Sequence, residues 1–126
     1  MSGAILARVY EAFAIPSYTK LEEKLWGAKQ KFGKTDICYI LQGGYCSWHY
    51  HQFTINNFLV VSGSIAFIQQ NLEKATFSIG DTWSVGPYVT HKFKALENSI
   101  VLENYDYASA SIDIVRKDTG GINEYL

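Results

Sequence analysis

The sequence has little of several features that mark large classes of protein. Its only two cysteines, Cys38 and Cys46, do not make the framework of a small disulfide-rich protein, so we expect free thiols. No charge is in excess: 11 lysines and arginines stand against 12 acidic residues, which leaves no basic surface for nucleic acid or an anionic membrane. No apolar run approaches the roughly 18 residues of a membrane-spanning helix. Residues 1–14 lack the pattern of a secretion signal, so we expect a cytoplasmic protein.

Apolar and aromatic side chains, by contrast, are plentiful. Hydrophobic residues make up 48% of the 126 residues and aromatic residues 15%, which is typical of a compact protein rather than a disordered chain. A chain of this length forms one domain of ordinary size. We therefore expect a single domain over residues 1–126, with its barrel core at about residues 36–116.

From Asp36 onward, apolar and polar residues alternate with a period of two, as they do in half-buried strands. Turn sequences such as Gly43-Gly44 and Gly80-Asp81 separate the alternating runs. The predicted strands cover residues 37–41, 47–52, 58–61, 64–70, 75–78, 82–85, 91–95 and 99–105. Eight short strands at regular spacing favour an all-β, antiparallel barrel or double-sheet jelly roll.

The segments outside this region give weaker patterns. Alternation over residues 5–9 predicts a strand, and residues 17–25, with an N-cap candidate at Ser17 or Thr19, predict a short helix or an irregular loop. We interpret the charged residues between Lys20 and Lys31 as a solvent-exposed face. A further strand-like piece covers residues 112–115.

Histidine is rare, and its placement indicates a metal site. The chain has three: His49, His51 and His91. Residues two apart on a strand point to the same face, so His49 and His51 share one wall of the predicted barrel. Three imidazoles on an inner wall suit one divalent transition metal ion such as Zn, Fe, Ni or Mn. Three protein ligands also leave coordination positions open, as catalytic metal sites do.

The surroundings of these histidines resemble the two sequence motifs of the cupin superfamily. The first block covers residues 43–63 and contains His49 and His51; the second covers residues 80–95 and contains His91. The resemblance implies a double-stranded β-helix, the cupin jelly-roll barrel, with a short helix or loop at its N-terminal end. It also implies that the three histidines point into the lumen at one metal ion.

The resemblance is incomplete at the position of the family's metal-binding glutamate. Asn56 stands there, and Ala95 stands where an asparagine often ends the second block. An amide carries no charge, so this change weakens the binding of hard cations, but its oxygen can still act as a weak ligand. Asn56 is therefore a candidate fourth ligand.

The flanks of the two blocks resemble the small sugar-isomerase and sugar-epimerase cupins, which are related to the type II phosphomannose isomerase domain. The likeness covers residues 25–27, 95–105 and 113–116. It implies a metal-dependent isomerase or epimerase acting on a sugar or similar polyhydroxylated metabolite, with Glu103 as the acid or base. Tyr39 is a candidate to line the pocket with its hydroxyl.

Two other functions stay open: a three-histidine iron dioxygenase of a small molecule, and a non-catalytic cupin that binds or senses a small ligand. All three predict a small-molecule partner, and none predicts nucleic acid or a membrane. If His49 and His51 face inward, Trp48 and Tyr50 face outward. Two large aromatics on an outer face are usually covered, so we expect a homodimer.

Overall fold

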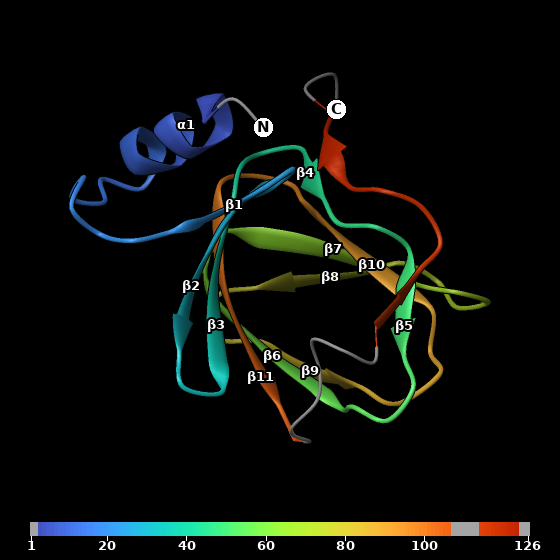
Figure 1. Ribbon diagram of the computed structural model, residues 1–126. Helices are drawn as coiled ribbons and strands as arrows, with labels where there is room; N and C mark the ends of the chain where they lie inside the picture. Colours follow the sequence, from blue (N-terminus) through green and yellow to red (C-terminus); the bar gives the residue numbers. More distant parts are fainter. Residues whose placement is uncertain (1–2, 107–113, 124–126) are drawn as a thin grey trace.

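The computed structural model describes residues 3–106 and 114–123, which form two antiparallel β-sheets and one α-helix (Figure 1). The first sheet contains, in spatial order, β1 (Glu22–Lys24), β2 (Gly27–Phe32), β3 (Thr35–Ile40), β11 (Ser99–Tyr105), β6 (Asn56–Ser62) and β9 (Thr82–Val85). The second contains β12 (Ile114–Arg116), β5 (His49–His51), β10 (His91–Ala95), β4 (Gly44–Tyr45) and β13 (Gly121–Ile122), while β7 (Ser64–Gln69) pairs with both β10 and β8 (Ala75–Ser78). This architecture confirms the predicted all-β jelly roll.

The interior between the sheets is filled by side chains that alternate along the strands. On β6, Asn56, Phe58 and Val60 are buried, and the residues between them are partly exposed. On β11, Val101 and Glu103 are buried in the same alternating way. Most of the core is apolar and aromatic. The same inward rows therefore carry a few polar side chains into an otherwise apolar interior.

All eight strands predicted from the sequence are present. Four of them, β8, β9, β10 and β11, have the predicted bounds, and the other four differ by one or two residues at their ends. The strand-like piece at residues 112–115 begins outside the described residues, and its described part belongs to β12. The strands that the sequence did not predict are β1 and β2, which are rich in charged residues, and the two-residue strands β4 and β13.

The N-terminal segment corrects one prediction, because the predicted strand at residues 5–9 is part of the helix α1 (Ala4–Ala12). Ile5, Leu6 and Val9 recur at helical spacing on the face of α1 that packs against the outside of the barrel. They meet Ala28 of β2 and Tyr39 of β3, and Figure 1 shows the helix lying outside the two sheets. The short run of alternating residues was compatible with both periods.

The segment after the helix corrects a second prediction. Of residues 17–25, predicted as a short helix or an irregular loop, residues 17–21 are irregular and Glu22–Lys24 form β1, which continues through a tight turn into β2. The lysine-rich stretch is therefore a strand pair, not a uniformly solvated face. On β2, Ala28 packs toward α1, so the neighbouring Lys29 points to the opposite face, into the barrel.

Both cysteine thiols are free and buried, as the sequence predicted. Cys38 lies on β3 and Cys46 directly follows β4. Burial raises the pKa of Cys46 to about 12, so this thiol stays protonated near neutral pH. In the described part of the chain, no helix is long and apolar enough to cross a membrane.

Candidate metal centre

The three histidines lie on two neighbouring strands and face the same interior. His49 and His51 are the ends of β5, and His91 begins β10 directly opposite His49 in the strand register. All three are buried, and their potential ligand atoms lie within 4.8 Å of one another. Bonds of about 2.1 Å to one tetrahedral ion place the ligand atoms about 3.4 Å apart, so the rings would have to move toward one another to bind it. With that movement the three side chains could bind one metal ion.

Hydrogen bonds fix the orientation of two of the rings. Nδ1 of His49 donates to the carbonyl oxygen of Ser47, and Nδ1 of His91 donates to that of Val89, each at 2.7 Å. A carbonyl only accepts, so in these neutral rings the proton is on Nδ1 and the lone pair is on Nε2. Metal-binding histidines commonly donate their other ring N–H to a backbone carbonyl in this way.

Two buried polar atoms, on His91 and Asn56, also indicate a ligand site. Among the described residues, neither the buried Nε2 of His91 nor the buried Oδ1 of Asn56 has a hydrogen-bond partner. A buried acceptor left without a donor is costly, and natural proteins keep few of them. A divalent metal ion accepts the lone pairs of such atoms, so the donor set fits the metal that the sequence predicted.

The protonation states also suit metal binding. Burial, and next the neighbouring His91 ring, lower the pKa of His49 to about 4. Burial likewise lowers the pKa of His91. Both rings are therefore neutral near pH 7, and protons do not compete for their lone pairs.

Asn56 connects the histidines to the carboxylate of Glu103. Its Nδ2 lies 3.1 Å from Nε2 of His51 and donates to Oε2 of Glu103, also at 3.1 Å. The side chain is fully buried. Glu103 therefore points into the lumen, as its predicted role requires, and only one amide group separates it from the histidine cluster.

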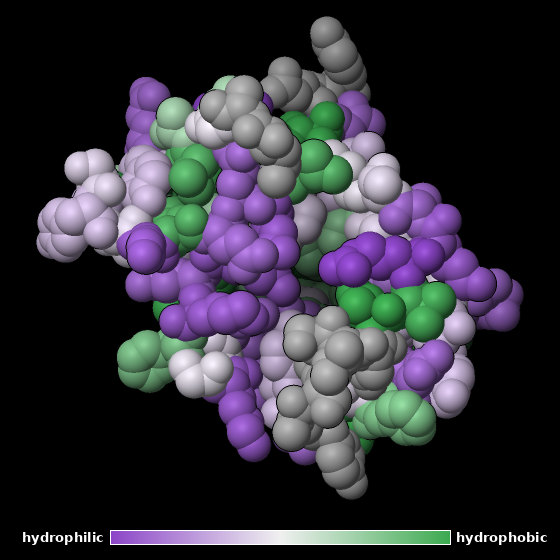
Figure 2. All heavy atoms as spheres, in the orientation of Figure 1, coloured by the Kyte–Doolittle hydropathy of each residue, from purple (hydrophilic) through white to green (hydrophobic). Residues whose placement is uncertain are grey.

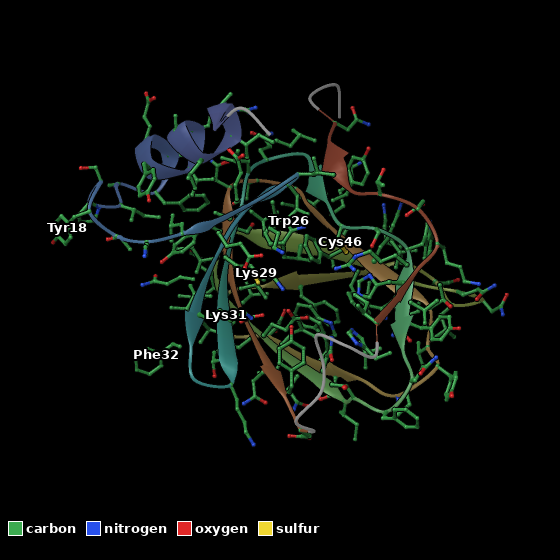
Figure 3. All side chains as sticks on the ribbon, viewed as in Figure 1. Tyr18, Trp26, Lys29, Lys31, Phe32 and Cys46 are labelled. Atoms are coloured by element: carbon green, nitrogen blue, oxygen red, sulfur yellow. The ribbon has the colours of Figure 1, made fainter. Side chains whose placement is uncertain are left out.

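A lysine that the sequence interpretation placed in solvent holds the other oxygen of this carboxylate. Nζ of Lys29 lies 3.2 Å from Oε1 of Glu103 and 3.2 Å from Oδ2 of Asp36. The hydroxyl oxygen of Tyr105 lies 2.8 Å from Oε1 of Glu103 and 3.1 Å from Oδ2 of Asp36, so its single proton is shared between the two carboxylates. Figure 3 shows Lys29 directed from β2 toward the interior, near Trp26 and Cys46. The four polar side chains form a buried network beside the candidate metal centre.

This network sets the charge of each of its members. Burial opposes ionisation of Glu103, but the charge of Lys29 and the hydrogen bonds from Tyr105 and Lys29 outweigh it and lower the pKa. The pKa of Asp36 is lowered, against the effect of burial, mainly by Lys29. Burial and the adjacent Glu103 raise the pKa of Tyr105, so its hydroxyl stays protonated. At neutral pH the network therefore contains one ammonium and two carboxylates.

Three members of the network, Lys29, Glu103 and Tyr105, open together with His49 and His51 into one cavity of about 440 Å³. His49, His51, Glu103 and Lys29 line its inner part, and Arg116 lines it from β12. Figure 2 shows a hollow on this face of the molecule, with hydrophilic side chains at its border. The cavity is large enough for a small organic molecule.

The structure corrects the prediction that Tyr39 lines this cavity. Along β3 the buried Cys38 and Ile40 belong to the barrel core, so Tyr39 between them faces outward. Its ring packs edge-on against Phe13 with the ring centroids 5.4 Å apart, and its hydroxyl donates to Gln30. Both faces of β3 are covered, one by the core and one by the N-terminal segment. The alternation along β3 therefore did not show whether Tyr39 faces the cavity or the N-terminal helix.

The outward-facing aromatic residues of β5 and its neighbourhood are half-buried. The ammonium of Lys92 lies over the ring of Trp48, 5.1 Å from its centroid, and that of Lys117 lies over Tyr50 at 5.6 Å. Tyr88 stacks on Tyr50. The predicted homodimer remains a prediction that rests on this face.

Comparison with known proteins supports the assignment of the fold. No protein-family model matches the chain, and no curated protein sequence does. Among solved structures, an RmlC-like cupin from Shewanella frigidimarina matches with a TM-score of 0.62 at 16% identity, over 77% of this chain and 91% of that one.

Two larger proteins also contain a similar barrel. Oxalate decarboxylase from Bacillus subtilis matches with a TM-score of 0.67 at 14% identity over 80% of this chain. The capsular polysaccharide assembling protein CapF from Staphylococcus aureus matches with 0.60 at 16% over 83%. The chain spans only 30% and 34% of the length of these two proteins. Together with the two sheets and their strand order, these matches show that the chain has the jelly-roll fold of the cupin superfamily.

Proposed function

We propose that the protein is a metal-dependent isomerase or epimerase of a sugar or a similar polyhydroxylated small molecule. The observation that carries this proposal is Glu103, a buried and ionised carboxylate in the same cavity as His49 and His51. Such reactions need a base that removes a proton from carbon, next to a group that stabilises the negative charge that develops. Glu103 would be the base, and a metal ion held by the histidines would stabilise the negative charge.

His49, His51 and His91 would hold the metal, and the orphaned Oδ1 of Asn56 makes this residue a candidate fourth ligand. When bound, a divalent metal ion in this site supplies Lewis acidity, which polarises a carbonyl or hydroxyl oxygen of the substrate. His49 and His91 keep their orientation because their Nδ1 protons are engaged by backbone carbonyls.

Glu103 would move the proton. Lys29 and Tyr105 both contact Oε1, whereas the Asn56 amide is the one donor to Oε2 among the described residues, so Oε2 is the oxygen with the freer lone pair. A carboxylate with a lowered pKa is fully ionised at pH 7 but is a weak base. It therefore needs a substrate C–H that is already acidic, such as one next to a polarised carbonyl.

The mixed polarity of the cavity supports a polyhydroxylated substrate. Carboxylates, a phenol hydroxyl and cations all line it, and they offer both donors and acceptors to hydroxyl groups. The similar fold of CapF, a capsular polysaccharide assembling protein, is consistent with sugar chemistry on this type of barrel. Fold likeness alone does not decide the activity.

Hydrogen exchange with solvent tests the proposal. Metal-loaded protein is incubated in D₂O with fructose, mannose, glucuronate and fructose 6-phosphate, and NMR follows deuterium incorporation beside the carbonyl carbon. We expect exchange with at least one sugar, lost in Glu103→Gln and kept in Glu22→Gln. Glu22 is the matched control because it lines the same cavity but pairs with Lys24 at the exposed rim.

The same assay separates the rival functions. Oxygen uptake by the iron-loaded protein, without exchange, would favour a three-histidine dioxygenase. Ligand binding with neither exchange nor oxygen uptake would favour a binding or sensing module. The absence of exchange into all four sugars, with the metal site loaded, would contradict the isomerase proposal.

A further inference from the structure

The strand register places an arginine beside the histidine cluster. β12 pairs with β5, and Arg116 is the direct partner of His49. Directly opposed residues of antiparallel strands project to the same face, with Cβ atoms about 4.5–5.5 Å apart. Arg116 accordingly lines the same cavity as His49. It belongs to one sheet, through β12, whereas β2 belongs to the other.

The charged groups of the cavity are otherwise engaged with one another or with the backbone. Each of the four acids among its described lining residues has a donor. These pairs are Glu22 with Lys24, Glu23 with the Leu6 amide, Asp118 with the Trp48 amide, and Glu103 with Lys29. The two lysines that line the cavity are thus paired as well.

Arg116 is the exception. Of the three cations among the described lining residues, it is the one without a hydrogen bond or ion pair to another described residue. Arg116 is an exposed residue, so a ligand in the cavity can reach its five N–H donors. A guanidinium binds carboxylate and phosphate groups through two parallel hydrogen bonds, a geometry that neutral hydroxyls do not match.

We infer that the substrate carries an anionic group, a carboxylate or a phosphate, which Arg116 binds while the adjacent hydroxylated part of the molecule faces His49. This inference rests on the proposed function and narrows its substrate class to acidic or phosphorylated sugars and similar hydroxylated anions. Arg116 is a binding and orienting residue. The proton-transfer residue remains Glu103, which reaches the cavity from the other sheet.

Binding measurements that need no turnover test the inference. Isothermal titration of the metal-loaded protein compares three probes with related carbon chains: gluconate, glucitol 6-phosphate and neutral glucitol. The variants are Arg116→Gln and, as a matched control, Lys117→Gln. Lys117 is the next residue, loses the same charge, and lies over the Tyr50 ring on the outer face.

We expect at least one of the two anions to bind wild-type protein more tightly than glucitol. Its dissociation constant should rise at least tenfold in Arg116→Gln and change less than twofold in Lys117→Gln. A preference for gluconate identifies a carboxylate, and a preference for the phosphate probe identifies a phosphate. Equal binding of all three probes, no binding of either anion, or equal effects of the two substitutions would overturn the inference.

The metal content of each sample, measured in parallel, keeps this test apart from that of the proposed function. Arg116-dependent anion binding without deuterium exchange would disprove the isomerase proposal and leave the anion site standing. Deuterium exchange into a neutral sugar at a rate that Arg116→Gln does not change would support the isomerase proposal and disprove the anion site.

Discussion

Replacing Lys29 by methionine should destabilise the protein strongly, because this lysine neutralises two buried carboxylates. Its Nζ lies 3.2 Å from both Asp36 and Glu103, which are 3% and 9% exposed. Removing one partner of a buried ion pair and leaving the other costs about 3–5 kcal/mol. Lys29→Met keeps the apolar length of the side chain, so most of this loss comes from the uncompensated charge.

Lys31→Met is the matched control. Lys31 lies on the same strand and also pairs with Asp36, at 3.4 Å, but its side chain is 65% exposed. An exposed pair of this kind contributes less than about 1 kcal/mol. Urea unfolding of both variants at pH 7, with the slope m compared to wild type, gives the two losses of unfolding free energy on the same scale.

The pH dependence of the unfolding free energy also distinguishes Lys29→Met from Lys31→Met. In the wild type the pKa values of Asp36 and Glu103 are lowered, so their contribution is present above the unfolded pKa and is lost as the pH falls through the folded values. In Lys29→Met the effect of burial is no longer outweighed by the lysine charge, so the pKa values of Asp36 and Glu103 in the folded protein rise. The deficit of Lys29→Met should therefore be largest near pH 7 and shrink below about pH 4. Equal losses for Lys29→Met and Lys31→Met, or a deficit independent of pH, would refute the reasoning.

Three further predictions follow from single side chains. Because the pKa of His49 is lowered to about 4, stability should fall as the pH drops below about 6.5, by up to about 3 kcal/mol at pH 4, and His49→Gln should flatten that part of the unfolding profile. Gly27→Ala should prevent folding, since its Cβ would lie 1.9 Å from a backbone oxygen of β3, whereas Gly33→Ala, with open space, should cost only about 1 kcal/mol by thermal denaturation. Tyr105→Phe removes a hydroxyl 2.8 Å from Glu103, and we expect a raised carboxylate pKa, measured as an upward shift of the acidic limb of the exchange rate.

The sequence predicted those parts of the site that depend on the spacing of residues close together in the chain. His49 and His51 share a face by strand geometry, and the glycine-bounded blocks indicated the place of His91. Each of these relations depends on a few neighbouring residues and on the period of a strand. The strands β8 to β11 were predicted for the same reason.

The remaining features depend on partners that are distant in sequence. Lys29 is inside because Glu103, 74 residues later, neutralises it, and nothing in a lysine-rich run indicates that partner. Arg116 faces the cavity through its register with His49, which spacing alone does not set. Tyr39 was misplaced because β3 is covered on both faces, so alternation does not distinguish the lumen from the helix side.

The central claim is that His49, His51 and His91 bind one metal ion together. The most direct test is elemental analysis combined with zinc titration of wild-type protein and His91→Ala. We predict one divalent ion per wild-type chain and at least a hundredfold loss of zinc affinity in His91→Ala, with the fold retained by circular dichroism. Failure of wild-type protein to bind zinc or another divalent transition metal, or equal zinc binding by folded His91→Ala, would contradict the claim.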